Sequence, residues 1–250
     1  MSGSRKPGSI PTYPETSIQS VVAPAGDWWV NDPAYAYSRG RLVMAFLPHV
    51  SQVPLVIYGE GRKDAAVHEY FRCKFEPLDV KRPRRKEILP VAALPTPDAE
   101  VRAVYLAKKR PAVIVAEVGK AVPKELTLGK PAWQTAPTLL VAPYYGTEEG
   151  GNRAGFNPVF LDRVQKCEYS RFMLDWLPVN GSSGGSILRV DHIQPIGSHH
   201  NSLEPTAWRL NDEALNILDE WICWHFEGQL AEDTNIAAAR SLLLELDSIL

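Results

Sequence analysis

Cysteines are few in this sequence, and no motif pairs them. The three residues, Cys73, Cys167 and Cys223, are odd in number and lie far apart, and none belongs to a Cys-x-x-Cys motif. Such spacing disfavours both a disulfide framework and a zinc site. We therefore expect a protein of the reducing cytoplasm that works without a metal or another cofactor.

Long apolar runs and an excess of one charge are missing as well. No run reaches the ~18 apolar residues that indicate a membrane-spanning helix, and the N-terminal stretch MSGSRKPGSIPTYPETS lacks the apolar core of a secretory signal. The formal net charge is -2 over 250 residues, so no overall basic field indicates nucleic-acid binding. These absences disfavour membrane insertion and secretion, and a nucleic-acid function would have to rest on local patches.

Proline is abundant, and it favours short strands and loops over long helices. The sequence has 21 prolines, against the roughly 12 that an average usage of about 5% would give. We expect a mainly β (α+β) chain that forms a small β-barrel. Apolar or alternating stretches bounded by glycine or proline predict strands over residues 40–48, 54–58, 67–75, 112–115, 138–143, 171–178 and 186–196.

The two ends of the sequence differ from this pattern. Residues 1–26 are rich in Pro, Ser, Gly and Thr and predict an extended or disordered arm, whereas the tryptophan pair at 28–29 should dock on the core. Near the other end, Asn211 as an N-cap and Gly228 as a stop delimit one helix. A second helix is expected over about 235–250, packed either on its own domain or on a partner.

A basic triplet meets an apolar strand near the middle of the chain. Lys108-Lys109-Arg110 is followed by Pro111 and then by the run at 112–115, which is apolar on both faces. Proline disfavours the helical conformation in the residue before it, so Arg110 should be extended at the start of a central strand. A guanidinium held rigidly there suits a phosphate group. The alternative is an ordinary surface arginine.

The densest charge run, KRPRRK at residues 81–86, has more than one interpretation. It is a solvated loop, a contact with nucleic-acid phosphates through Arg82, Arg84 and Arg85, or a localisation signal. The glycine-rich stretch 144–151 fits neither G-x-G-x-x-G nor the P-loop pattern. A nucleotide-binding function is therefore disfavoured.

Four stretches follow one another in a recognisable order. They are the glycine-led strand 40–48, the Lys-Arg-Pro and apolar run 109–115, the strand end 140–143 and the run ILRVDHI at 187–193. This ordered set resembles the PemK/MazF family of toxins, which belong to toxin–antitoxin modules and cut single-stranded RNA. The match covers about residues 39–48 and 107–228, and it implies an SH3-like small β-barrel, usually dimeric, with a C-terminal helix.

The resemblance implies a domain organisation. Residues 1–38 would form a partly disordered N-terminal arm, residues 39–228 the barrel domain, and residues 229–250 the C-terminal helix. Residues 49–107 stand where the family has a short loop. This insertion would lie over the RNA groove as a lid, a subdomain or a built-in inhibitor.

The resemblance also implies which residues meet RNA. Arg110 matches the family's arginine and would stabilise charge on the scissile phosphate. The family's Thr or Ser, which positions that phosphate, falls on Tyr145, with Thr147 two residues later. Either hydroxyl would serve, and Tyr145 is equally suited to stack on a base or to a structural role. Lys108 and Lys109 would contact the RNA backbone.

His192 stands where the family has a glutamine. Because histidine titrates near neutral pH, His192 is either an acid or base that contacts RNA or a core residue inside an alternating strand. His199 and His200 lie in a polar stretch and are further candidates for the acid or base, although histidines in such stretches are more often simply exposed. Together with Asp191, these histidines show no recognised metal-ligand spacing.

We therefore expect a metal-independent endoribonuclease toxin. Its expected partners are single-stranded RNA, an antitoxin protein and a second copy in a homodimer, but no membrane. The alternative is a non-catalytic RNA- or protein-binding module that keeps the barrel and has lost catalysis through the change to Tyr145. A third hypothesis is a self-inhibited toxin, with the insertion or the tail filling the groove.

Overall fold

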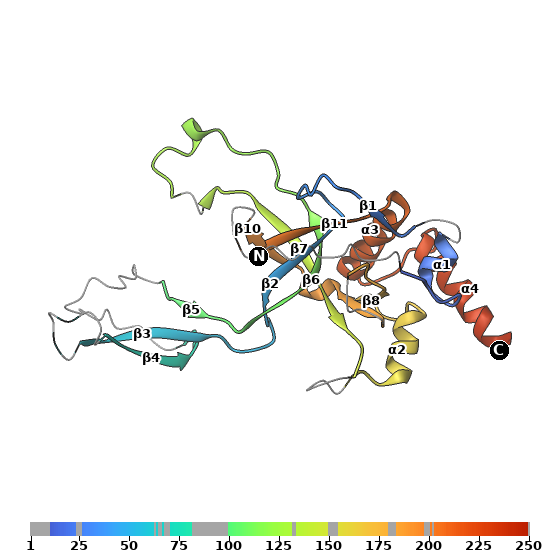
Figure 1. The fold of residues 1–250 in the computed structure, drawn as a ribbon, viewed down its shortest axis with the longest axis horizontal. Coiled ribbons are helices and arrows are strands. Elements are labelled where there is room, and N and C mark those ends of the chain that lie inside the picture. Colours follow the sequence, from blue (N-terminus) through green and yellow to red (C-terminus); the bar gives the residue numbers. More distant parts are fainter. Residues whose placement is uncertain are drawn as a thin grey trace, which may run out of the picture. The chain divides into compact units, whose positions relative to one another are not determined.

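The computed structural model shows a mainly β chain of the α+β class, as the sequence predicts (Figure 1). The chain divides into two compact units, one of residues 1–46 with 109–250 and one of residues 47–108. The second unit spans nearly the same residues as the stretch 49–107. The structure describes residues 11–23, 27–62, 64, 67, 71–81, 100–131, 134–149, 155–179, 184–197, 201 and 203–249.

The larger sheet contains eight strands in the order β1-β11-β2-β6-β7-β9-β8, with β10 paired to β7. Among the described residues, this sheet does not close into a barrel. Strand β11 is antiparallel to both β1 and β2. Strand β7 is antiparallel to β6, β9 and β10, and β9 is also antiparallel to β8. The strands are β1 (Trp29–Asn31), β2 (Arg41–Pro48), β6 (Ala107–Ala116), β7 (Thr138–Gly146), β8 (Phe172–Asp175), β9 (Ser186–Arg189), β10 (Gln194–Gly197) and β11 (Leu203–Leu210).

The smaller unit has a sheet of its own. Its three strands, in the order β4-β3-β5, are β3 (Leu55–Arg62), β4 (Phe71–Pro77) and β5 (Ala103–Val104). The predicted strand 54–58 is confirmed but longer. Of the predicted strand 67–75, the structure describes β4 from Phe71 on.

Four α-helices accompany the strands within the described residues: α1 (Ile18–Val22), α2 (Pro158–Gln165), α3 (Asp212–Glu227) and α4 (Asn235–Ile249). Two 3-10 turns, η2 (Lys124–Leu126) and η4 (Val190–His192), complete the described elements used below. The predicted caps of α3 are confirmed, because Ala214 N donates to Asn211 Oδ1 and Gly228 ends the helix at φ 77°. None of the helices in the described part of the chain is long and apolar enough to cross a membrane.

The main core lies between the larger sheet and helices α3 and α4. Trp28 and Trp29 are fully buried in it, as predicted, together with Trp221 of α3. Helix α4 contributes the buried side chains of Ile236, Ala239 and Leu243 and packs against α1 and α3. Of the two alternatives for the tail helix, packing on its own domain is therefore confirmed.

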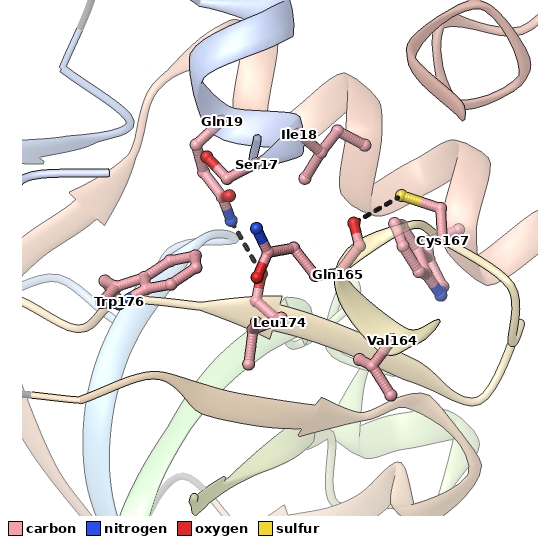
Figure 2. Close-up of a pocket in the computed structure, with 9 residues that line it drawn as sticks. Ser17, Ile18, Gln19, Val164, Gln165, Cys167, Leu174 and Trp176 are labelled. Atoms are coloured by element: carbon pink, nitrogen blue, oxygen red, sulfur yellow. Dashed lines mark hydrogen bonds between the residues drawn. The ribbon is translucent and has the colours of Figure 1, made fainter. Parts of the chain in front are cut away.

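The N-terminal arm differs from the sequence prediction, because residues 18–22 are helical. Helix α1 lies beside α4 (Figure 1), and Figure 2 shows its Gln19 side chain pointing toward Leu174 of β8. Gln19 Nε2 donates to the Leu174 carbonyl at 2.8 Å, and Gln165 Nε2 donates to the Thr16 carbonyl at 2.7 Å. We call this contact the N-terminal seam. It leaves no space for a water molecule, so it holds the arm and is no ligand site.

One prediction for the sheet is wrong. Residues 186–196 do not form a single strand, because the 3-10 turn η4 separates β9 from β10. The two strands then pair with different halves of β7. His192 consequently ends a turn and does not lie inside an alternating strand.

A buried carboxyl group lies on the core side of β7. Tyr144 Oη donates to Asp175 Oδ2 at 3.0 Å, and the Trp176 backbone N–H donates to Asp175 Oδ1 at 2.7 Å. Burial raises the pKa of Asp175 to about 7, although these hydrogen bonds oppose the shift. The indole N–H groups of Trp29 and Trp28 have no regular hydrogen-bond partner, yet they are near enough to lower the same pKa.

Asp175→Asn should alter how stability depends on pH. The folded-state pKa of about 7 exceeds the ordinary 3.8 of an unfolded chain, so the folded protein binds this proton more tightly. That stabilisation is complete below about pH 4 and is lost as the pH rises to about 7. Urea titrations measure the free energy of unfolding of wild type and of the variant. The amount by which the wild-type value exceeds the variant value should decrease between pH 4 and pH 7. An equal difference in the free energy of unfolding at pH 4 and pH 7 would contradict the effect of burial on this pKa. The control is Asp162→Asn, which changes an exposed carboxyl group.

Candidate functional site

The pairing of β6 with β7 brings Arg110 beside Tyr145. Ala112 lies opposite Pro143 and Val113 opposite Ala142, and the same register continued by two residues places Arg110 opposite Tyr145. The Arg110 Cζ atom lies 4.2 Å from the centroid of the Tyr145 ring, within the range of a cation–π contact. The arginine is only 8% exposed. The alternative of an ordinary surface arginine is therefore wrong, and an extended arginine held within a strand is confirmed.

Arg110 differs from Arg41, which is also buried. The Arg41 guanidinium forms an ion pair with Asp32, and it donates to the carbonyls of Asp32 at 2.8 Å, Ala36 at 3.1 Å and Thr206 at 3.2 Å. By contrast, Arg110 Nε is buried without a hydrogen-bond partner, and no carboxylate among the described residues forms an ion pair with Arg110. Among the described residues, its positive charge therefore faces the tyrosine ring and no carboxylate.

His192 connects Tyr145 to a second arginine. Its Nδ1 lies 2.7 Å from Tyr145 Oη, and its Nε2 lies 2.7 Å from Arg189 Nη2. Because a guanidinium only donates, Nε2 must be the accepting nitrogen and the neutral ring carries its proton on Nδ1. Nδ1–H then donates to Tyr145 Oη. The phenolic proton of Tyr145 is consequently free to be donated to another group.

Asp191 fixes the position of Arg189. Arg189 Nε and Nη2 each donate to a carboxylate oxygen of Asp191 at 2.7 Å, in a bidentate pair. Although partial burial raises the pKa of Asp191, this pair holds it below its usual value. Burial, followed by the charges of Arg189 and Arg110, lowers the pKa of His192, against the opposing effect of Asp191. His192 is therefore neutral at neutral pH.

The other predicted site residues are not drawn into this cluster. Thr147 Oγ1 donates to the Gly185 carbonyl at 2.7 Å, so its proton is already used. Lys109 is paired with Glu204 at 3.0 Å, and Lys108 is exposed on β6. The remaining predicted residues, Arg82, Arg84, Arg85, His199 and His200, lie outside the described residues.

Sequence reasoning missed Arg189, although a signal for it was present. Arg189 precedes Asp191 by two residues and His192 by three, a spacing that permits local side-chain contacts in a tight turn. The predicted continuous strand would have placed Arg189 and His192 on opposite faces. The described residues contain no group of three His, Cys, Asp or Glu side chains placed to hold a metal ion.

Comparisons with known proteins identify no relative. No protein-family model matches the chain, and searches of curated proteins and of solved structures found no match. The site is therefore interpreted from its own geometry.

Arg189→Gln should raise the pKa of His192. The substitution removes a positive charge next to the imidazole and leaves Asp191, which favours the imidazolium, without its bidentate partner. An NMR titration of the histidine ring protons, assigned with His192→Asn, would measure the change. Lys109→Gln removes a cation elsewhere and should leave the His192 pKa unaltered. An unchanged or lower pKa in Arg189→Gln would show that Arg189 does not control this histidine.

Proposed function

We propose that this protein is an endoribonuclease of the PemK/MazF type that cleaves single-stranded RNA without a metal, and that its larger sheet, which is open among the described residues, is a variant of the SH3-like barrel. The observation that supports the proposal is the buried, unpaired Arg110 guanidinium stacked on Tyr145. Beside it, Tyr145 has a phenolic proton that is not used by His192. A cation and an oriented hydrogen-bond donor thus lie together where a phosphate would bind.

The proposed reaction uses the ribose 2′-hydroxyl as the nucleophile. Its oxygen loses its proton and attacks the neighbouring phosphorus, and a 2′,3′-cyclic phosphate forms as the bond from phosphorus to the 5′ oxygen breaks. The leaving 5′ oxygen takes up a proton from water and becomes a hydroxyl group. Negative charge builds up on the non-bridging oxygens as the bond forms, and a fixed guanidinium is suited to stabilise it. Arg110 would supply that charge, and Tyr145 Oη–H would donate to a phosphate oxygen.

Proton transfer involves His192 only after a rearrangement. Nε2 accepts from Arg189, and Nδ1–H donates to Tyr145, so neither nitrogen is free to take the 2′-hydroxyl proton. A phosphate that binds Arg189 would compete with this contact and expose Nε2. A lowered pKa keeps His192 unprotonated, as a base requires.

A second candidate is a non-catalytic module that binds single-stranded RNA. It is favoured by the two engaged nitrogens of His192 and by the Thr147 hydroxyl, whose proton is committed to Gly185. In this case Arg110 and Tyr145 would hold a phosphate without cleaving its ester. A homodimer and an antitoxin protein, implied by the resemblance, belong to the first candidate.

Arg110→Lys and Arg110→Ala should lower the rate of RNA cleavage by about a hundredfold or more, because the fork of donors that faces the phosphate is lost. The measurement is single-turnover cleavage of a labelled single-stranded RNA, with and without EDTA. Wild-type cleavage should be the same in both conditions. Because Arg110 is buried, circular dichroism and thermal melting must first show that each variant is folded.

Lys109→Ala is the matched control, because it removes the preceding cation, which is exposed and paired with Glu204. It should retain most of the cleavage rate. Full activity in folded Arg110→Ala would refute the proposed role of Arg110. RNA binding by wild type without any cleavage would leave only the second candidate.

A further inference from the structure

Aromatic rings and guanidinium groups continue from the candidate site onto β8 and α2. Arg189 Cζ lies 5.8 Å from the Tyr145 ring centroid and 4.9 Å from the Phe172 ring centroid. Phe172 meets Phe160 edge to face at 5.3 Å, and Phe160 stacks on Phe156 at 5.7 Å. Together with Arg110, these six side chains form a continuous path, which we call the aromatic–arginine ladder.

The ladder is anchored on one side and accessible on the other. Phe160 and Phe172 pack against the small core of Val164, Leu174 and Ile187, and both keep partial exposure. Phe156 is 40% exposed and stacks on Phe160 with an interplanar angle of 29°. A flat ligand could therefore stack on Phe156 without displacing the small core.

Positive charge gathers at one end of the ladder. Arg171 Cζ lies 5.2 Å from the Phe172 ring centroid, and no carboxylate among the described residues forms an ion pair with it. Arg189 shares its charge with Asp191, and Arg110 has no such partner. At the other end, the side chain of Glu149 lies against Gly155, next to Phe156. An anionic backbone is thus favoured at the arginine end, and uncharged rings are favoured at Phe156.

We propose that the aromatic–arginine ladder, together with the neighbouring Arg171, binds single-stranded RNA next to the scissile phosphate. Phosphates would bind Arg110, Arg189 and Arg171, and an unpaired base would stack on Phe156. Single-stranded nucleic acids are commonly bound by such a combination of cations and stacking rings. The inference rests on the proposed function for the position of the scissile phosphate, but RNA binding itself does not require cleavage.

The test measures binding of an RNA oligonucleotide that cannot be cleaved because its 2′-hydroxyls are methylated. In fluorescence anisotropy at fixed salt, Phe156→Ala should weaken binding about tenfold, since it removes one stacking surface. Arg171→Lys should also weaken binding, because it keeps the charge and loses the planar group. Val159→Ala is the control, because Val159 is 66% exposed in helix α2, three residues after Phe156; it should bind like wild type.

A second probe separates stacking from general attraction. An oligonucleotide of the same length with abasic positions should bind wild type more weakly, and Phe156→Ala should weaken that complex no further. Wild-type affinity in both folded Phe156→Ala and Arg171→Lys would overturn the ladder as an RNA site, even if Arg110 proved essential for cleavage. Weakened binding in both variants, with no cleavage by wild type, would support the ladder and refute the nuclease proposal.

Discussion

The register between β6 and β7 is the constraint on which both the core and the candidate site depend. Successive residues of β7 point to opposite faces, so Tyr144 reaches Asp175 in the core while Tyr145 lies beside Arg110. A slip of one residue would exchange these two faces. The tyrosine pair therefore couples the packing of the domain to the geometry of the site, and the buried Asp175 helps to fix the position of β7.

Arg41 and Arg110 are both buried, but their charges are compensated to different extents. A buried charge is costly unless it is paired and hydrogen-bonded. Arg41 meets this requirement with several carbonyls and Asp32, so it stabilises the turn before β2. Arg110 meets it only in part, through the ring of Tyr145. Buried polar groups without a hydrogen-bond partner are exceptions in folded proteins. They tend to occur at functional sites.

Local sequence signals predicted much of the architecture. Gly40 before β2 is an example, because its φ of 77° favours glycine. An added Cβ would lie 2.8 Å from Leu215 Cδ2, so the leucine side chain would also have to shift. Pro111 after Arg110 and the caps of α3 were equally informative, since each acts on its immediate neighbours. The candidate site was predicted only in part. Arg110 and Tyr145 were identified, but their contact depends on strand pairing, which local patterns do not encode.

Other features could not be predicted because they depend on distant contacts. The break at η4 follows from β7 pairing with β9 along one half and with β10 along the other. The aromatic–arginine ladder joins residues of α2, the segment before it, β6, β7, β8 and β9, and these residues show no common periodicity in the sequence. Helix α1 is too short to be stable alone, so its presence reflects its burial against α4 and β8.

The N-terminal seam also has a consequence for the order of folding. Ile18 and Gln19 are buried through contacts with segments that lie much later in the chain, including β8 and α4. During synthesis the arm must remain without these partners until those segments have emerged. Contacts between such distant parts of a chain slow folding. The arm can therefore complete its packing only after β8 and α4 have been synthesised.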